Sequence, residues 1–116
     1  MQKVILDTDI GTDIDDAVCL AYLLRQPECD LIGITTATGE ADKRASLCHA
    51  ICAAEGWEGL PIHVGAHQPL IIEQRQTQAA QAEALSHYPH RSDWEADTAV
   101  DFLRRTIREN PGEITL

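Results

Sequence analysis

The sequence predicts an α/β fold with a mainly parallel sheet and flanking helices. Short apolar runs rich in β-branched residues alternate along the chain with longer segments of helical periodicity. Strands that alternate with helices favour parallel pairing, because each helix returns the chain to the same end of the sheet. A parallel sheet has both faces covered, so these strands are expected to be buried.

The first part of the chain gives three elements in order. Residues 2–7 form an apolar run that predicts the first strand, and residues 15–25 have helical spacing. This helix is apolar on nearly all sides, so we expect it to be buried, and Pro27 follows it as a stop signal. Residues 31–36 (LIGITT) then predict a second buried strand.

Residues 41–55 predict a second helix that ends at Gly56. The side expected to face inward carries small and apolar residues, and the charged or polar residues are placed elsewhere on the helix. The inward set is Ala45, Cys48, Ile51 and Cys52, and the other set is Lys43, Arg44 and His49.

The second half of the chain is less regular. A short third strand is expected at 61–65, and residues 66–94 follow with only a weak helical signal at 74–86. Residues 95–109 predict a helix, and 113–116 begin a fourth strand after Pro111-Gly112. One face of that helix should carry Ala96, Ala99, Val100, Leu103 and Ile107, with Asp101 and Arg105 paired one turn apart.

Charge and size restrict the class of partner. The chain has 116 residues, with 19 acidic against 9 basic side chains and a formal net charge of -10. Nucleic acids and anionic membranes attract basic surfaces, so neither is an expected partner. No apolar stretch approaches the length of a membrane span. A small polar ligand or a cation is the expected partner.

The cysteines indicate a reducing compartment. Cys19, Cys29, Cys48 and Cys52 form no CxxC pair and have no histidine at zinc-binding spacing. Free thiols without a signal peptide favour the cytoplasm, with disulfides as the minority alternative.

The most informative feature is a run of acids directly after the first strand. Five carboxylates, Asp7, Asp9, Asp13, Asp15 and Asp16, lie within ten residues. Such crowding of like charge is costly unless a cation compensates it, and oxygen ligands suit a hard divalent cation. Capping of the following helix can explain the last three acids. It leaves the acids at the strand end unexplained, and that edge of an α/β sheet binds ligands.

The run Asp7–Ala17 resembles the N-terminal signature of the inosine-uridine preferring nucleoside hydrolases. The segments 31–36, 64–70, 99–102, 107–108 and 110–116 also resemble successive parts of that family. The resemblance implies that residues 1–116 are the N-terminal portion of a single nucleoside hydrolase-like α/β domain, incomplete at the C-terminus. The end of the chain inside a strand agrees with a truncated sheet.

The resemblance also implies an activity and roles for single residues. Members hydrolyse the N-glycosidic bond of ribonucleosides with one calcium ion (Ca²⁺). Asp9 resembles the catalytic aspartate that binds calcium and activates water, and Asp16 a second calcium ligand. Asp15 resembles the residue that binds the ribose hydroxyls, and Asp7 a supporting acid. Asp13 receives no role.

Two features depart from the family pattern. Glu40 stands where many members have a ribose-binding asparagine, so we assign it to the substrate-binding set with an altered sugar contact. His87 and His90 lie in the region of the family's His-Gly segment but are expected to be solvated loop residues. Further calcium ligands and the leaving-group acid lie beyond Leu116 in the family, so we expect the chain alone to be inactive and to bind calcium weakly. An oligomer of identical chains is expected from the open sheet edge.

Two other interpretations stay open. Asp7 and Asp9 also fit the strand-end DxD of haloacid dehalogenase-like phosphatases, with Asp7 as nucleophile and magnesium between them. Alternatively, the chain is a catalytically inert fragment or an interaction module.

Overall fold

The sheet contains four parallel strands. The computed structural model describes all 116 residues and gives β1 (Gln2–Thr8), β2 (Cys29–Thr36), β3 (Ile62–Val64) and β4 (Ile114–Thr115). Their order across the sheet is β3-β2-β1-β4, and every pairing is parallel. The predicted α/β class with a parallel sheet is therefore confirmed.

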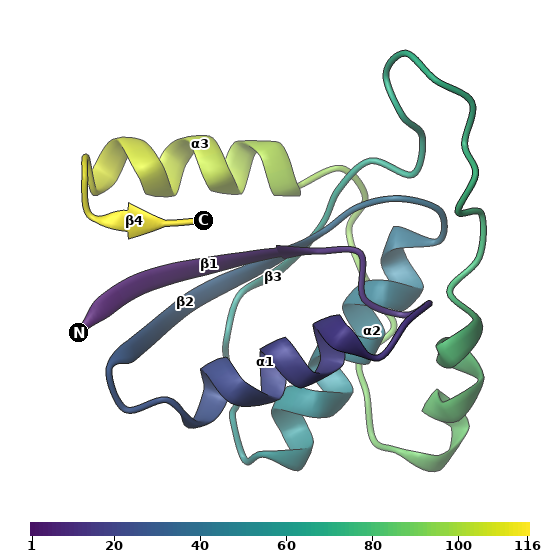
Figure 1. The fold of residues 1–116 in the computed structure, drawn as a ribbon, viewed down its shortest axis with the longest axis horizontal. Coiled ribbons are helices and arrows are strands. Elements are labelled where there is room, and N and C mark those ends of the chain that lie inside the picture. Colours follow the sequence, from purple (N-terminus) through teal and green to yellow (C-terminus); the bar gives the residue numbers. More distant parts are fainter.

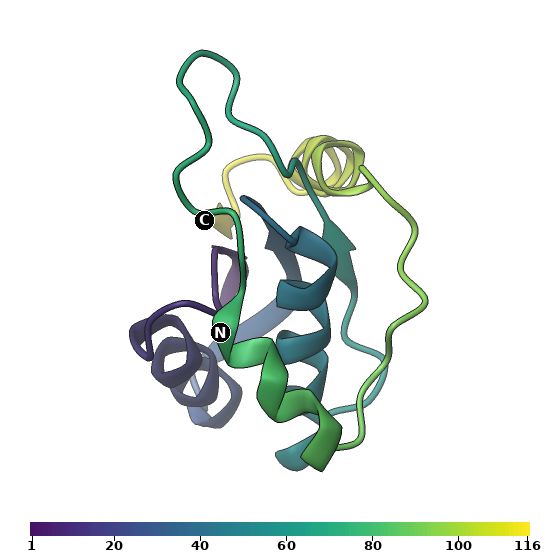
Figure 2. The ribbon, with the colours of Figure 1, turned by 90° about the vertical axis from the view of Figure 1, so that its right-hand side faces the viewer.

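Helices cover both faces of this sheet. Figures 1 and 2 show α1 (Asp15–Arg25) and α2 (Ala41–Ala54) on one face, and α3 (Ala99–Glu109) on the other. The 3-10 helix η1 (Ala80–His87) lies beside α2 and accounts for the second part of the helical signal at 74–86. None of the helices combines the length and hydropathy that a membrane span requires.

The main core lies between the sheet and the helices α1 and α2. Its members come from four elements and from the loop after β1, and they are Ile10, Leu20, Leu24, Cys29, Leu31, Ile34, Ala41, Ala45, Cys48, Cys52, Ile62 and Val64. Cys48 and Cys52 face inward as predicted, because small side chains let α2 approach the sheet closely.

Helix α1 differs from its expected burial. Only Leu20 and Leu24 are buried, whereas Val18 and Tyr22 are 60% and 62% exposed. A helix that lies on one face of a sheet contacts it along a single stripe, so apolar residues on its other sides face solvent. The prediction of a helix buried all round was wrong.

Helix α3 also differs from prediction. It begins at Ala99 rather than near residue 95, and its buried residues are Ala99 and Phe102. Val100 and Ile107 from the predicted inner face are 63% and 43% exposed. The expected pairing of Asp101 with the residue four positions on is replaced by a long contact to Arg104 at 4.0 Å.

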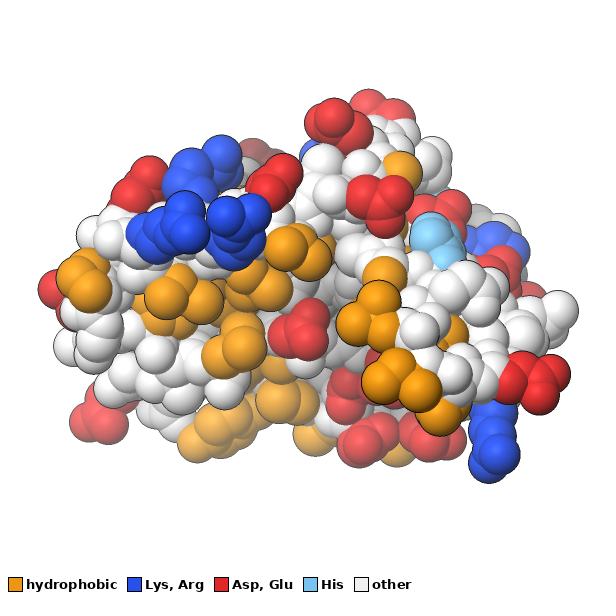
Figure 3. All heavy atoms as spheres, turned by 90° about the horizontal axis from the view of Figure 1, so that it is seen from above, with side chains coloured by type: hydrophobic (Ala, Val, Ile, Leu, Met, Phe, Trp, Pro, Cys, Tyr) orange, Lys and Arg blue, Asp and Glu red, His pale blue; other side chains and the backbone are white.

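Phe102 explains this rotation of α3. A Cβ on Gly33 of β2 would overlap the Phe102 ring, so the absence of a side chain on the strand makes room for the aromatic ring. The outer face of the helix carries exposed Arg104, Arg105 and Arg108. Figure 3 shows basic side chains gathered over this face, with hydrophobic side chains beside them.

The strand order changes direction at β1, which has β2 on one side and β4 on the other. From β1 the chain proceeds through α1 to β2 and through α2 to β3, and it then returns through α3 on the other face to pair β4 with β1. β1 is therefore followed by α1 on one face of the sheet, whereas its neighbour β4 is reached through α3 on the other face. In open α/β sheets such a point forms a crevice that binds ligands.

Candidate functional site

The acidic loop, defined as Asp7–Asp16, leaves β1 at its carboxyl end. Thr8 is buried at the strand end, and its Oγ1 donates a hydrogen bond to Asp16 Oδ2 at 2.5 Å. The same oxygen accepts the Ile10 N–H at 3.0 Å. Thr8 therefore joins the end of β1 to the first turn of α1 and fixes one carboxylate of the loop.

Asp9 and Asp16 form a carboxylate pair. The pKa of Asp9 is raised, first because the group is partly desolvated and then because of the neighbouring Asp16 carboxyl, whose charge repels its own. Two neighbouring carboxylates bind a cation more readily than either does alone. The structure thus brings together the two residues expected to bind the metal.

The other acids of the loop have different surroundings. Asp7 Oδ1 accepts a hydrogen bond of 2.6 Å from the Thr35 hydroxyl of β2, where the two residues are paired in the sheet. Asp13 and Asp15 are exposed. Asp15 opens α1 beside Asp16, and adjacent positions at a helix start project in different directions. Asp7 is therefore tied to the sheet, and Asp15 is free to meet a ligand from solvent.

Arg44 is the residue that sequence reasoning placed wrongly. We expected it outside the inward face of α2, but it is fully buried, with 0% of its surface exposed. Its spacing carried the signal: Arg44 lies three residues after Ala41 and four before Cys48, both of which are buried. Burial lowers the pKa of Arg44, while the charge of Asp9 opposes that shift.

The Arg44 guanidinium contacts the acidic loop from inside the protein. Nη1 lies 2.8 Å from the carbonyl oxygen of Asp9, 3.2 Å from that of Ile10 and 3.1 Å from Thr12 Oγ1. Nε donates to the Gly39 carbonyl at 2.8 Å, and Nη2 to the Gln78 carbonyl at 3.2 Å. One buried side chain therefore joins three chain segments.

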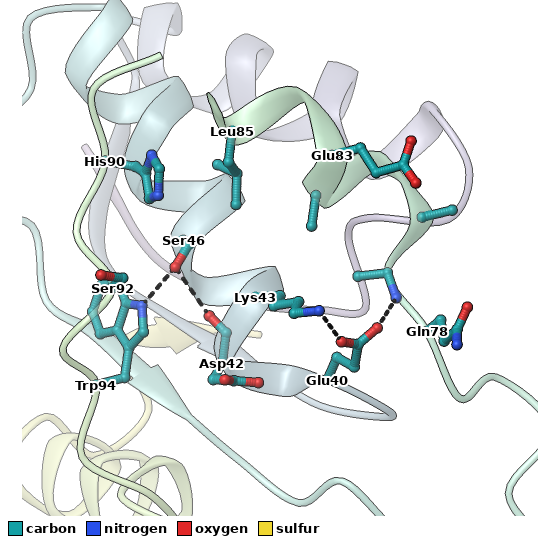
Figure 4. A pocket seen from close by; sticks show the side chains of 13 residues that line it. Glu40, Asp42, Lys43, Ser46, Gln78, Glu83, Leu85, His90, Ser92 and Trp94 are labelled. Carbon is teal, nitrogen blue, oxygen red and sulfur yellow. Dashed lines mark hydrogen bonds and ion pairs between the residues drawn. The ribbon is translucent and has the colours of Figure 1, made fainter. Parts of the chain in front are cut away.

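Glu40 occupies a different position from the carboxylate pair. Its Oε1 accepts the Ala79 N–H at 3.1 Å, and its Oε2 forms an ion pair with Lys43. The pKa of Glu40 is lowered, chiefly by the hydrogen bond from Lys43. Figure 4 shows these contacts at a hollow of about 550 Å³ that is also lined by Ser46 and Trp94. None of the five loop aspartates lines this hollow.

The histidines lie outside the loop. His87 and His90 are exposed, as expected for solvated residues. His67, which the sequence did not single out, accepts the Ala41 N–H on Nδ1 at 3.2 Å and so caps the start of α2.

The acidic loop does not form a complete metal site. The chain contains no group of three or more histidine, cysteine, aspartate or glutamate side chains that could enclose a metal ion. The Asp9 and Asp16 carboxylates fit a hard cation in donor type. Calcium takes six to eight oxygen ligands, so these two residues fit as a portion of its coordination sphere.

A parallel α/β sheet with an acidic loop at the carboxyl end of its first strand is typical of α/β proteins that bind ligands at that end of the sheet. The model of the family described as inosine-uridine preferring nucleoside hydrolase matches residues 4–116. The chain therefore belongs to the inosine-uridine preferring nucleoside hydrolase family. This membership favours the hydrolase interpretation of the loop over the phosphatase one.

Known proteins resemble the chain along nearly its whole length. An uncharacterized protein of Schizosaccharomyces pombe is 32% identical over 98% of the chain. Uridine nucleosidase 1 of Arabidopsis thaliana is 27% identical over 99%. The structure of a plant nucleoside hydrolase superposes with a TM-score of 0.79 at 30% identity, covering 97% of the chain. The fold of a purine-preferring ribonucleoside hydrolase from Gardnerella vaginalis is similar, with a TM-score of 0.79 at 23% identity.

The chain spans little more than a third of these proteins. It covers 38% of the S. pombe protein, 36% of the A. thaliana enzyme and 37% of the plant nucleoside hydrolase chain. The four-stranded sheet and its acidic loop therefore correspond to one part of each longer fold.

Proposed function

We propose that the whole protein hydrolyses the N-glycosidic bond of ribonucleosides to free base and ribose. The observation that carries this proposal is the Asp9–Asp16 carboxylate pair at the carboxyl end of β1, in a chain of the nucleoside hydrolase family. The names of its relatives cover uridine, pyrimidine and purine nucleosides, so the proposal includes no base preference.

The residue roles follow from the chemistry of the reaction. Water adds to the anomeric carbon while the carbon–nitrogen bond breaks and its electron pair leaves with the base, which takes up a proton. Asp9 accepts the proton of the attacking water, a role for which a raised pKa is suited. The ribose develops positive charge as the base departs, and the nearby carboxylates stabilise it.

Binding of metal and sugar is divided among neighbouring residues. We propose that Asp9 and Asp16 hold a calcium ion, which when bound lowers the pKa of a coordinated water. Asp15 accepts hydrogen bonds from the ribose hydroxyls, and Asp7 supports the loop through Thr35. Glu40 stays in the substrate-binding set on one condition: its carboxylate must release Lys43 and the Ala79 N–H before it can bind the sugar.

The short chain is proposed to be inactive by itself. Two paired carboxylates supply too few oxygens for strong calcium binding, and the chain covers 36% to 38% of its relatives' length. The remaining ligands and the acid that protonates the base are assigned to the rest of the protein. This proposal retains the inert-fragment alternative for the short chain alone.

The test is base release from inosine and uridine by a chain extended to the length of its relatives. Asp9→Asn should lower kcat by about 10²- to 10⁴-fold, because amide nitrogen and oxygen cannot accept the water proton as a carboxylate does. Calcium affinity, measured by calorimetry, should fall in parallel.

Asp13→Asn is the matched control, since it removes one carboxylate from the same loop at an exposed position without a role. Full turnover by Asp9→Asn, or equal losses in both variants, would contradict the assignment. Hydrolysis of a generic phosphate ester that disappears in Asp7→Asn would instead support the phosphatase alternative.

Partners and compartment complete the proposal. The ligand is a small-molecule ribonucleoside, and the net charge of -10 disfavours nucleic acid and anionic membranes. All four cysteines are free, which agrees with a reducing, cytoplasmic compartment. A homo-oligomer remains a prediction that sedimentation of the extended chain can test.

A further inference from the structure

Arg44 presents an unusual combination of full burial and charge. No Asp or Glu oxygen is among its hydrogen-bond partners; all five acceptors are backbone carbonyls or the Thr12 hydroxyl. Burial of a cation is costly unless hydrogen bonds compensate it, and the five acceptors provide this compensation for Arg44. The acidic side chains whose charges act on Arg44 are Asp9 and Glu40, and each opposes the lowering of its pKa by burial.

The acceptors show what this side chain does. Three of them belong to residues 9–12 of the acidic loop. The other two are the carbonyl oxygens of Gly39, just before α2, and of Gln78, just before η1. The contact to the Asp9 carbonyl fixes the backbone of the residue whose carboxylate pairs with Asp16.

The neighbouring backbone depends on the same arrangement. Gly11 adopts φ +128°, and a Cβ there would lie 3.0 Å from the Ala79 Cβ and 3.3 Å from Arg44 Nη1. The Gly11 carbonyl accepts the Gln81 N–H at 2.9 Å. The loop is therefore pressed between Arg44 and the segment that leads into η1.

We propose that Arg44 is a positioning residue of the candidate active site: its guanidinium fork holds the acidic loop in the conformation that pairs Asp9 with Asp16. The inference rests on the proposed function for its consequence in metal binding, and on the loop contacts alone for its effect on conformation. Lysine would keep the charge but cannot reproduce a planar fork with five donors.

The test compares Arg44→Lys with Arg25→Gln in the same chain. Arg25→Gln is the control, because it removes an exposed arginine whose partner is Glu55, away from the loop. Amide hydrogen exchange without metal reports loop order at Ile10 and Gln81, with Ile34 of β2 as the internal reference. Calcium titration by calorimetry reports the consequence for the carboxylate pair.

We expect Arg44→Lys to speed exchange at Ile10 and Gln81 by about tenfold while Ile34 stays protected, since local opening breaks contacts of this strength. Calcium affinity should fall by about tenfold or more, as for residues that orient metal ligands. Arg25→Gln should match the parent chain in both measurements.

Three other outcomes separate the possibilities. Parent-like exchange and affinity in Arg44→Lys would overturn the inference, because charge alone would suffice. Equal acceleration at all three amides would also overturn it, because Arg44 would then support the fold as a whole. Loop-specific acceleration in Arg44→Lys, together with a parent chain that binds no calcium, would support the inference on conformation while refuting the proposed metal site.

Discussion

At the scale of single residues, the acidic loop shows how far a local motif can be interpreted. Five aspartates in sequence marked the loop, but their spacing did not decide which carboxylates meet. The Thr8 hydroxyl decides this by holding Asp16 at the strand end next to Asp9. Such a contact depends on backbone geometry across eight residues, which composition does not describe.

Arg44 shows the opposite error, in which a charged residue was assigned to the surface by type. Its position on α2 shared the spacing of Ala41 and Cys48, and the structure buries all three. Charge is a good predictor of exposure except where backbone carbonyls supply the partners.

His63 gives a prediction for pH dependence. It lies on β3, with Nδ1 2.8 Å from Thr98 Oγ1 and its ring stacked on Phe102 at 4.4 Å. Burial, followed by the charges of Arg105 and Arg91, lowers its pKa below the ordinary 6.5. The unfolded chain therefore binds the proton first, so this contribution to stability is present above pH 6.5 and is lost as pH falls toward the folded pKa.

We expect the free energy of unfolding, measured with urea at a series of pH values, to fall less steeply below pH 6.5 in His63→Gln than in the parent chain. His87→Gln is the control, because that histidine is exposed. An unchanged slope in His63→Gln would refute the stated cause.

At the scale of elements, the sequence predicted the boundaries of helices and strands better than their buried faces. The strand at 2–7, the helix at 15–25 and the helix at 41–55 were predicted within a residue or so, since periodicity is a local property. The outward sides of α1 and α3 were not, because a helix of mixed apolar character can pack along several stripes. The partner element selects the stripe.

The contact between β2 and α3 can be tested by substitution. Gly33→Ala should destabilise the chain by about 1–3 kcal/mol, because its Cβ would overlap the Phe102 ring. Phe102→Leu removes that overlap, so the double variant should be more stable than the sum of the single losses predicts. Urea unfolding of the four chains gives the coupling energy, and strictly additive losses would refute direct contact.

At the scale of the whole molecule, the excess of acids should be visible in the response to salt. With a net charge of -10, folding brings like charges together, and screening reduces their repulsion. We expect Tm to rise between about 0.02 and 0.5 M NaCl, over which the screening length becomes shorter than typical charge separations. Choline chloride should act equally, since the effect needs no specific cation; a fall in Tm with both salts would contradict it.

The sequence by itself determined the α/β class, the order of strands and helices, the family and the position of the acids after β1. These properties depend on neighbouring residues and on short motifs, so they can be predicted without knowledge of long-range contacts. Only the tertiary structure decided that Asp9 lies beside Asp16 and that Phe102 covers Gly33. It also decided that Arg44 of α2 is buried beneath the acidic loop and binds its backbone. Contacts such as Arg44 with Asp9 join residues 35 positions apart, and packing of the whole fold selects them.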